Sequence, residues 1–390
     1  MKRISFSFAT ALFICSAVAQ AQPVNQFPTT KVWDVYEHWK NCYGQDFGNV
    51  LHRQGWDRYV MFYGKISDQF GGLTSVPDAR LFPGAEGWNL GAYSENIWVT
   101  WSMTDGKSFG QEAGVKPPLL LITSLDFVNF YNSHLPPGAP VRYLDRGTCW
   151  VIGDAAGEVG NKGIWYLFFD TEEECGVAPA QGGIYAASSK TWHSGYQIRG
   201  KAVLPGIPPF FFPSVFREPD TGELYLYYSE AQVYGLAGRL RGVKIVDDGV
   251  GLTYEPLNGD KPVISSGAEG FNPARRISVF KYGRKYYAVT DRLGEGYVDD
   301  FSANQLFLLG PSDKPYGFDW RTRKTILTRQ DGTFFDKSMW APSVVSPDDG
   351  DPANVRVYFW GTGSPGCGPN VNEAGHGSAG LLELPVSKLP

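Results

Sequence analysis

Five short apolar segments of the chain are each preceded by a residue whose side chain could reach a shared site. These residues are Asp46 in "QDFGNV", Asp145 in "LDRGTCW", Phe212 in "FFFPSV", Glu269 in "AEGFNPARRISV" and Asp336 in "DKSMWAPSV". Two carboxyl groups on either side of a substrate can act as general acid and general base when their environments separate their pKa values. The pattern predicts acid–base chemistry, and a phenylalanine stands at one of the five places.

The elements around these residues repeat in a fixed order. Each apolar segment precedes a polar or glycine-containing turn, then an aromatic strand, then a third strand. The predicted first strands are residues 48–51, 149–152, 213–216, 277–280 and 342–345. The predicted second strands are residues 59–64, 164–169, 224–229, 286–290 and 355–360. The predicted third strands are residues 97–102, 183–187, 240–245, 305–309 and 380–384.

Repeats of this kind indicate a propeller, a solenoid or an array. Three copies continue into a turn that fits a fourth, outer strand. We therefore predict an all-β fold, a five-bladed β-propeller of four-stranded antiparallel blades. The high aromatic content of 15% and the 47 glycines suit many short strands joined by tight turns. A β-sandwich with a second, small domain is the alternative.

The first residues have the features of a secretory signal peptide. A basic pair, Lys2 and Arg3, precedes a short apolar core, and Ala19-Gln20-Ala21 matches a cleavage site. We expect residues 1–21 to be removed and residues 22–390 to form a single propeller domain, secreted or periplasmic. No later apolar run is long enough for a membrane span. The net charge of −5, without a basic run, argues against nucleic acid as a partner, and we expect a monomer.

Four cysteines remain after the predicted cleavage: Cys42, Cys149, Cys175 and Cys367. An even number in an exported protein suggests two disulfides, with three possible pairings. We favour Cys42–Cys367, which would join the ends of the ring, and Cys149–Cys175, which would bracket one hairpin. No C-x-x-C occurs and the histidines are scattered, so no metal site is predicted. We expect no cofactor, although a structural Ca²⁺ ion in the channel is compatible with the fold.

Three segments together resemble motifs of glycoside hydrolase family 43 and its five-bladed relatives. They are "DFGNVLHRQGWDRYVMFYG", "FPSVFREPDTGELYLYYS" and "AEGFNPARRISVFKYGRKYYAV". The resemblance implies that Asp46 is the general base and Glu269 the general acid, in the two-carboxylate arrangement of glycoside hydrolysis. A second Asp of the family, which tunes the pKa of the acid, falls on Phe212. Glu269 also lies further from its strand than in the family, which leaves Asn272 as an alternative at that place.

Further residues are candidates for the same site, each with a structural alternative. Asp145 is a third catalytic candidate, or an ion-paired loop residue beside Arg146. The candidates for substrate binding are Phe212, Trp340, Arg275, Glu230 and Asp291. For the tryptophan the alternative is a place in the core, and for the charged residues it is a local ion pair.

These residues predict an exported glycoside hydrolase acting on a polysaccharide or oligosaccharide, with furanosides such as arabinose among the candidate substrates. Phe212 favours one alternative, a carbohydrate-binding propeller without catalysis, because an aromatic ring supplies a stacking surface in place of a carboxylate. A second alternative is a hydrolase or lyase that uses a different catalytic set on the same scaffold.

Overall fold

The computed structural model describes residues 32–35, 46–66, 95–103, 105–109, 119–122, 126–127, 130, 133, 137, 150–160, 162–173, 183–200, 203–205, 210–230, 239–249, 251–265, 274–292, 305–336, 338–362 and 377–390. The predicted signal peptide and the four cysteines of the mature chain lie outside these residues. Among the described residues, no helix is long and apolar enough to cross a membrane.

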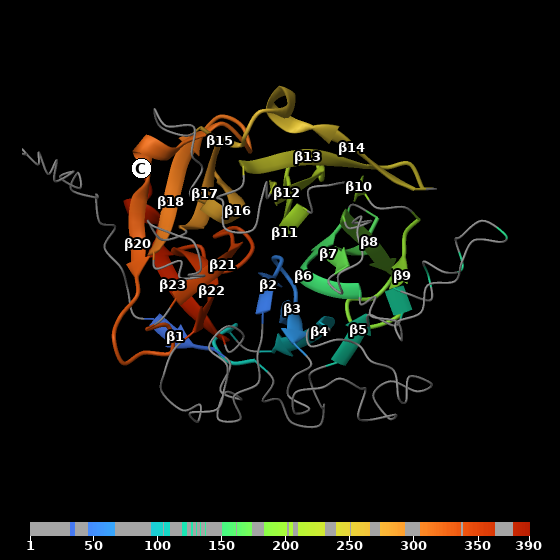
Figure 1. Ribbon diagram of the computed structural model, residues 1–390. Coiled ribbons are helices and arrows are strands. Elements are labelled where there is room, and N and C mark those ends of the chain that lie inside the picture. Colours follow the sequence, from blue (N-terminus) through green and yellow to red (C-terminus); the bar gives the residue numbers. More distant parts are fainter. Residues whose placement is uncertain are drawn as a thin grey trace, which may run out of the picture.

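Five antiparallel sheets are arranged in a ring, so the protein is an all-β, five-bladed propeller (Figure 1). Blade one contains β2 (Asp46–Leu51), β3 (Tyr59–Ile66), β4 (Glu95–Ser102) and β5 (Leu119–Ile122). Blade two contains β6 (Trp150–Val159), β7 (Trp165–Glu173), β8 (Gly183–Ser189), β9 (Gln197–Ile198) and β10 (Leu204–Pro205). Blade three contains β11 (Phe210–Arg217), β12 (Leu224–Glu230), β13 (Arg239–Asp247) and β14 (Leu252–Pro256).

The remaining elements complete the ring. Blade four contains β16 (Ala274–Tyr282), β17 (Lys285–Arg292), β18 (Gln305–Ser312) and β20 (Lys324–Thr328). Blade five contains β21 (Ser338–Val345), β22 (Asn354–Thr362), β23 (Gly377–Pro385) and β1 (Val32–Asp34). A small parallel pair joins β15 (Ile264–Ser265) to β19 (Phe318–Asp319). The short 3₁₀ turns are η4 (Leu257–Asp260), η5 (Trp320–Thr322) and η6 (Val386–Lys388). The predicted first, second and third strands all fall on strands of the structure, although Cys149 lies outside the described residues and Ile164 directly precedes β7.

The first strand of each blade lies at the centre of the ring. The inner strands β2, β6, β11, β16 and β21 contact one another in this order, and β21 contacts β2 (Figure 1). Side chain–backbone hydrogen bonds also join neighbouring inner strands. The Asn49 side chain donates to the Gly157 carbonyl and accepts from the Gly157 N–H, both at 2.8 Å. Ser343 accepts from the N–H of Val50, and Ser278 accepts from the N–H of Val344.

Ring closure uses the two ends of the chain. β1 pairs antiparallel with β23, with Trp33 opposite Leu381, and so supplies the outer strand of the last blade. The N–H of Val35 donates to the carbonyl of Ala379 just beyond this pair. This strand was not predicted from the sequence, and the disulfide predicted to close the ring involves cysteines that lie outside the described residues.

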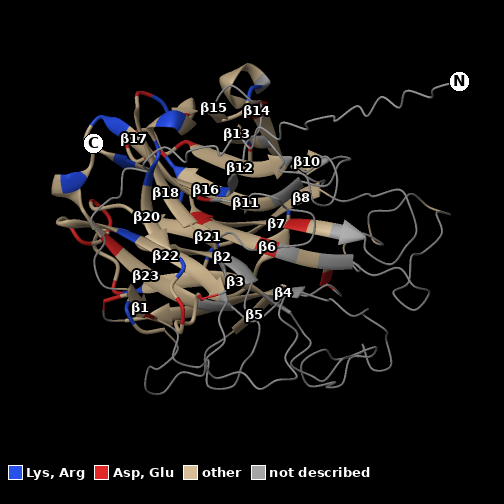
Figure 2. Ribbon diagram, turned by 60° about the vertical axis from the view of Figure 1, so that its left-hand side comes forward, with Lys and Arg blue, Asp and Glu red and all other residues tan. Residues whose placement is uncertain are grey.

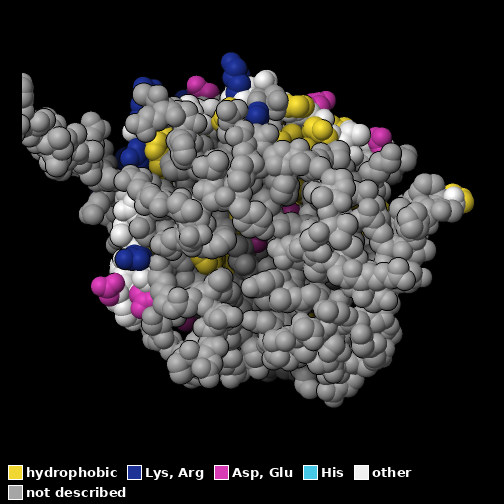
Figure 3. Space-filling view, in the orientation of Figure 1, with side chains coloured by type: hydrophobic (Ala, Val, Ile, Leu, Met, Phe, Trp, Pro, Cys, Tyr) yellow, Lys and Arg dark blue, Asp and Glu magenta, His cyan; other side chains and the backbone are white. Residues whose placement is uncertain are grey.

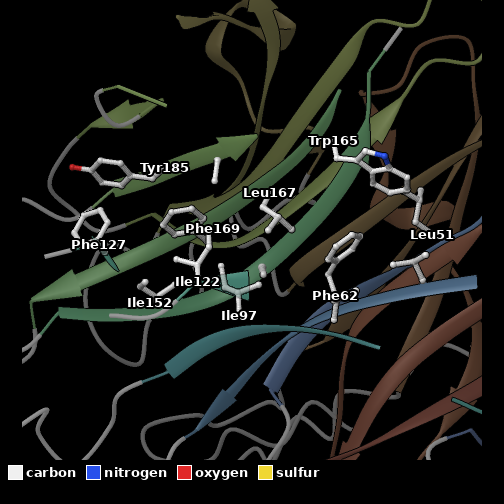
Figure 4. Packing of buried hydrophobic residues seen from close by; sticks show 14 residues of the cluster. Leu51, Phe62, Ile97, Ile122, Phe127, Ile152, Trp165, Leu167, Phe169 and Tyr185 are labelled. Carbon is white, nitrogen blue, oxygen red and sulfur yellow. The ribbon is translucent and has the colours of Figure 1, made fainter. Parts of the chain in front are cut away.

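Apolar side chains fill the spaces between blades. Between blades one and two, Phe62, Ile97, Ile152 and Phe169 belong to one buried cluster (Figure 4). Aromatic rings are large, and the fit is close: a Cβ on Gly157 would lie 2.3 Å from the ring of Phe62. Close packing of this kind holds the inner strands in fixed positions at the axis.

Candidate active site

All five inner strands have a register shift near their first residues. The shifts lie between Asp46 and Gly48, Ile152 and Ala155, Phe211 and Ser214, Ala274 and Ile277, and Trp340 and Ser343. A bulge bends the strand and redirects its side chains, and bulges often lie beside active sites. Because the shift recurs at the start of each inner strand, the five bulges face the same end of the ring.

Three of the predicted site residues occupy equivalent places at these bulges. Asp46 lies two residues before the point where the ladder of its blade resumes, at the pair Gly48–Tyr63. Phe212 and Arg275 have the same offset in blades three and four. The other two blades have Gly153 and Ala341 there. Asp46 is thus the single acidic residue among these five places.

Two of the bulges contain residues in the left-handed region of backbone space. Phe212 has φ 61° and Ala341 has φ 51°, and each precedes a proline. A residue other than glycine in this region costs on the order of 1–2 kcal/mol. Such a residue is retained only when its surroundings hold it, which directs attention to the groups that bond these backbones.

The ring of Phe212 crosses the axis of the propeller. This residue belongs to blade three, yet it packs against a buried cluster that contains Val50 and Met61 of blade one and Trp340 and Ala341 of blade five. Blades one and five are not neighbours of blade three. The side chain is partly exposed, so part of its aromatic surface is accessible at the level of the bulges.

Two buried aspartates bond the bulges of neighbouring blades. The carboxylate of Asp170, on β7, accepts the N–H of Phe212 at 3.0 Å and also that of Asp154 in its own blade. The carboxylate of Asp291, on β17, accepts the N–H of Arg276 at 2.9 Å in its own blade and that of Ala341 at 3.1 Å in blade five. Each aspartate therefore connects the bulge of its own blade to the bulge of the next.

The same region contains a buried guanidinium. Arg276 is 1% exposed, and its Nη2 donates to the carbonyl of Ala155 at 3.3 Å, which brings blade four to blade two across the axis. Asp154, Asp170 and Asp291 are likewise 4% exposed or less. Acidic residues lie within β6 and β7 in Figure 2, and Figure 3 shows acidic atoms near the centre of one face.

Burial changes the protonation of Asp170. Loss of hydration raises its pKa to about 7, and the N–H of Phe212 and the charge of Arg276 oppose this change. A carboxyl group with a pKa near neutrality can exchange a proton under ordinary conditions. Neither Asp154 nor Asp170 was predicted from the sequence as a site residue. The available signal was an acid inside an otherwise apolar strand, "WVIGDAAGEV" and "WYLFFD".

The other predicted site residues have different positions. Trp340 is 4% exposed in the cluster behind Phe212, and Asp291 is fully buried. Glu230 is at the end of β12, opposite Phe210 and Arg239 in the ladder. Asp145, Glu269 and the four cysteines lie outside the described residues. The side chains of Asp46, Arg275 and Glu230 are also outside the description, so their roles stay predictions.

The search for relatives by sequence found none: no family model and no curated protein matches the chain. Solved structures match over nearly the whole chain. Zg3597, a family 117 glycoside hydrolase of the marine bacterium Zobellia galactanivorans, has a TM-score of 0.53 at 14% identity and covers 93% of this chain and 92% of its own. BT0996, solved as a complex with RGII, has a TM-score of 0.55 at 13% identity and covers 92% of this protein and 92% of its own length.

An exo-1,5-alpha-L-arabinanase from a bovine ruminal metagenomic library has a TM-score of 0.50 at 13% identity, with 88% of this chain and 94% of that chain covered. The protein shares its five-bladed fold with these solved structures, a family 117 glycoside hydrolase and an arabinanase among them. The resemblance inferred from the sequence motifs is thereby confirmed for the fold. At such low identity the likeness is one of architecture and does not transfer a catalytic residue.

Among the described residues, no group of three or more His, Cys, Asp or Glu is arranged to hold a metal ion. A structural Ca²⁺ ion in the channel therefore stays a prediction. At the other ends of the inner strands, Arg53 of blade one bonds Glu158 of blade two at 2.5 Å and Asp349 of blade five at 3.0 Å. These ion pairs join three blades, so both ends of the channel contain charged groups with different partners.

Proposed function

We propose that the protein is an exported glycoside hydrolase whose site lies at the bulge end of the central channel. Asp46 is the base that activates water, and Glu269 is the acid that protonates the leaving oxygen. The observation that supports this most is the position of Asp46 at the bulge of its inner strand, in a fold shared with solved glycosidases. Phe212 lies at the equivalent place of blade three and offers its ring to the sugar.

The physical basis is a difference between two carboxyl groups. A base must be ionised at working pH, and an acid must keep its proton, which burial or a neighbouring negative charge promotes. Inversion at the anomeric carbon needs about 6.5–9.5 Å between the two carboxyl groups, which leaves room for water. Arabinofuranosides are the first substrates to try, because one structural neighbour is an arabinanase.

The test is an assay of the mature chain on aryl glycosides, beginning with 4-nitrophenyl α-L-arabinofuranoside, and on a panel of polysaccharides. Asp46→Asn and Glu269→Gln should each lower kcat by about 10²–10⁴-fold. Asp313→Asn is the control, because this aspartate is exposed and pairs with Lys285. Full activity in both Asp46→Asn and Glu269→Gln would contradict the assignment.

A second candidate function is binding of carbohydrate without cleavage. It is favoured by Phe212, whose ring lies where the family resemblance implies a carboxylate. Isothermal titration with the same polysaccharides separates the two candidates. Binding that Phe212→Ala weakens, without any release of sugar by the wild type, supports the second candidate over the first.

A further inference from the structure

Asp170 holds the backbone of a residue on the neighbouring blade. Its carboxylate accepts the N–H of Phe212 at 3.0 Å, and it is 3% exposed within β7. We propose that Asp170 is a positioning residue that fixes the direction of the Phe212 ring and so sets the floor of the sugar site. The inference rests on the proposed function insofar as it assigns the ring to that site.

The conformation of Phe212 makes its ring depend on this bond. At φ 61° the Cβ projects in a direction that an extended residue would not give. Pro213 follows and has its own φ fixed, so the strand offers few ways to correct a change at residue 212. A bond to the N–H restrains the backbone directly, and the ring then crosses the axis to the cluster of blades one and five.

Asp291 makes an equivalent hydrogen bond to a bulge residue that has no aromatic ring. It accepts the N–H of Ala341, which has φ 51° and also precedes a proline. The two aspartates thus make the same interaction. Each accepts the N–H of a bulge residue with positive φ on the next blade. Only the aspartate of blade two determines the position of a large side chain at the axis.

The side chain of Asp170 has two oxygens that can accept N–H groups. The N–H groups of Phe212 and Asp154 both donate to Asp170. An asparagine has one acceptor oxygen, and its NH₂ group would meet the second N–H as donor against donor. Asp170→Asn therefore keeps the side-chain size and makes the two N–H groups compete for one acceptor oxygen, which weakens the restraint on Phe212.

The experiment places 4-fluorophenylalanine at position 212 of the full chain and records its ¹⁹F resonance. We expect one narrow line in the parent and in Ser278→Ala, which loses a comparable bond to the Val344 N–H in blades four and five. In Asp170→Asn we expect the line to move by more than its width or to split. An unchanged line in Asp170→Asn, or an equal change in Ser278→Ala, would overturn the positioning role.

A second measurement covers the case in which Asp170→Asn folds poorly. Glycine adopts φ 61° without steric cost, so Phe212→Gly should remove much of the need for the bond. The midpoint of urea unfolding should then fall less when Asp170→Asn is added to Phe212→Gly than when it is added to the wild type. Additive losses would overturn the inference.

Sugar binding is read with the same label, so that the two proposals can fail separately. α-1,5-linked arabinotriose and each panel sugar are added in turn to the labelled parent. A sugar that binds at the site should shift the ¹⁹F line. If the protein hydrolyses a sugar but that sugar leaves the ¹⁹F line unchanged, the assignment of the ring to the site is overturned. The proposed role of Asp46 is not affected by this result. Hydrolysis that survives Asp46→Asn and Glu269→Gln contradicts the proposed function, whatever the line does.

Discussion

At the scale of single residues, the axis of the propeller combines an aromatic ring with several buried charges. Phe212 and Arg276 both cross from their own blade to non-adjacent ones. The nearby carboxylates of Asp170 and Asp291 are used to bond backbone N–H groups. These two buried carboxylates are thus hydrogen-bonded to backbone groups, as buried polar groups generally are.

The raised pKa of Asp170 predicts how stability depends on pH. In the unfolded chain this carboxyl should lose its proton near pH 4, whereas in the folded protein its pKa is about 7. Between these values the folded state binds the extra proton, so the free energy of unfolding falls as pH rises, by up to about 1.4 kcal/mol per unit. Above pH 7 this contribution is constant.

Urea unfolding at several pH values between 4.5 and 8 tests this expectation. The difference in unfolding free energy between wild type and Asp170→Asn should decrease as pH rises toward 7 and then level off. Asp313→Asn is the control, because its carboxyl is exposed and its pKa is lowered by Lys285. Parallel pH curves for the wild type and Asp170→Asn would contradict the assignment of the titration to Asp170.

At the scale of elements, the inner strands are joined to their neighbours by side chains that imitate backbone pairing. Asn49 of β2 makes two bonds to Gly157 of β6, as a strand residue would. Gly157 is needed there because any Cβ would collide with Phe62. The blades therefore hold their relative positions through a small number of matched polar groups as well as through packing.

Asn49→Ala should lower the free energy of unfolding by about 2–4 kcal/mol, because it leaves the N–H and carbonyl of Gly157 buried without this partner. Urea unfolding measures the loss. Asn354→Ala is the matched control: its amide bonds Asp351 within a turn, and we expect a loss under about 1 kcal/mol. Equal losses in the two variants would count against the role of Asn49 between blades.

At the scale of the whole molecule, the ring is closed by β1, which adds to the last blade from the other end of the chain. The bond from the Val35 N–H to Ala379 and the burial of Val35 extend this junction. Without β1, the strand β23 would be an open edge, and open edges promote association between chains.

A chain that begins at residue 36 should be less stable than one that begins at residue 31, by roughly 3 kcal/mol for the lost ladder bonds and the buried valine. Thermal unfolding and size-exclusion chromatography test this, with aggregates expected for the shorter chain. The chain from residue 31 is the control because it keeps β1. Equal midpoints and equal elution would show that closure does not depend on this strand.

The repeating unit follows from local sequence patterns. Aromatic strands such as residues 59–64 and 355–360 follow short turns, and local periodicity predicts them because alternate side chains must be buried between blades. The order of the units predicted the five blades, and the segment containing Asp46 predicted the start of the first inner strand. These features depend on neighbours within one unit, which a single sequence shows.

The residues that meet at the axis are brought together by long-range contacts. Asp170 bonds Phe212 across 42 positions of sequence, and Arg276 reaches Ala155 across 121. Likewise, β1 joins β23 from the far end of the chain. Such contacts arise because closing a ring brings the starts of all inner strands together, whatever their separation in sequence. No local sequence pattern predicts these long-range contacts. Asp154 and Asp170 were therefore identified from the structure, whereas Asp46 and Phe212 were identified from their sequence motifs.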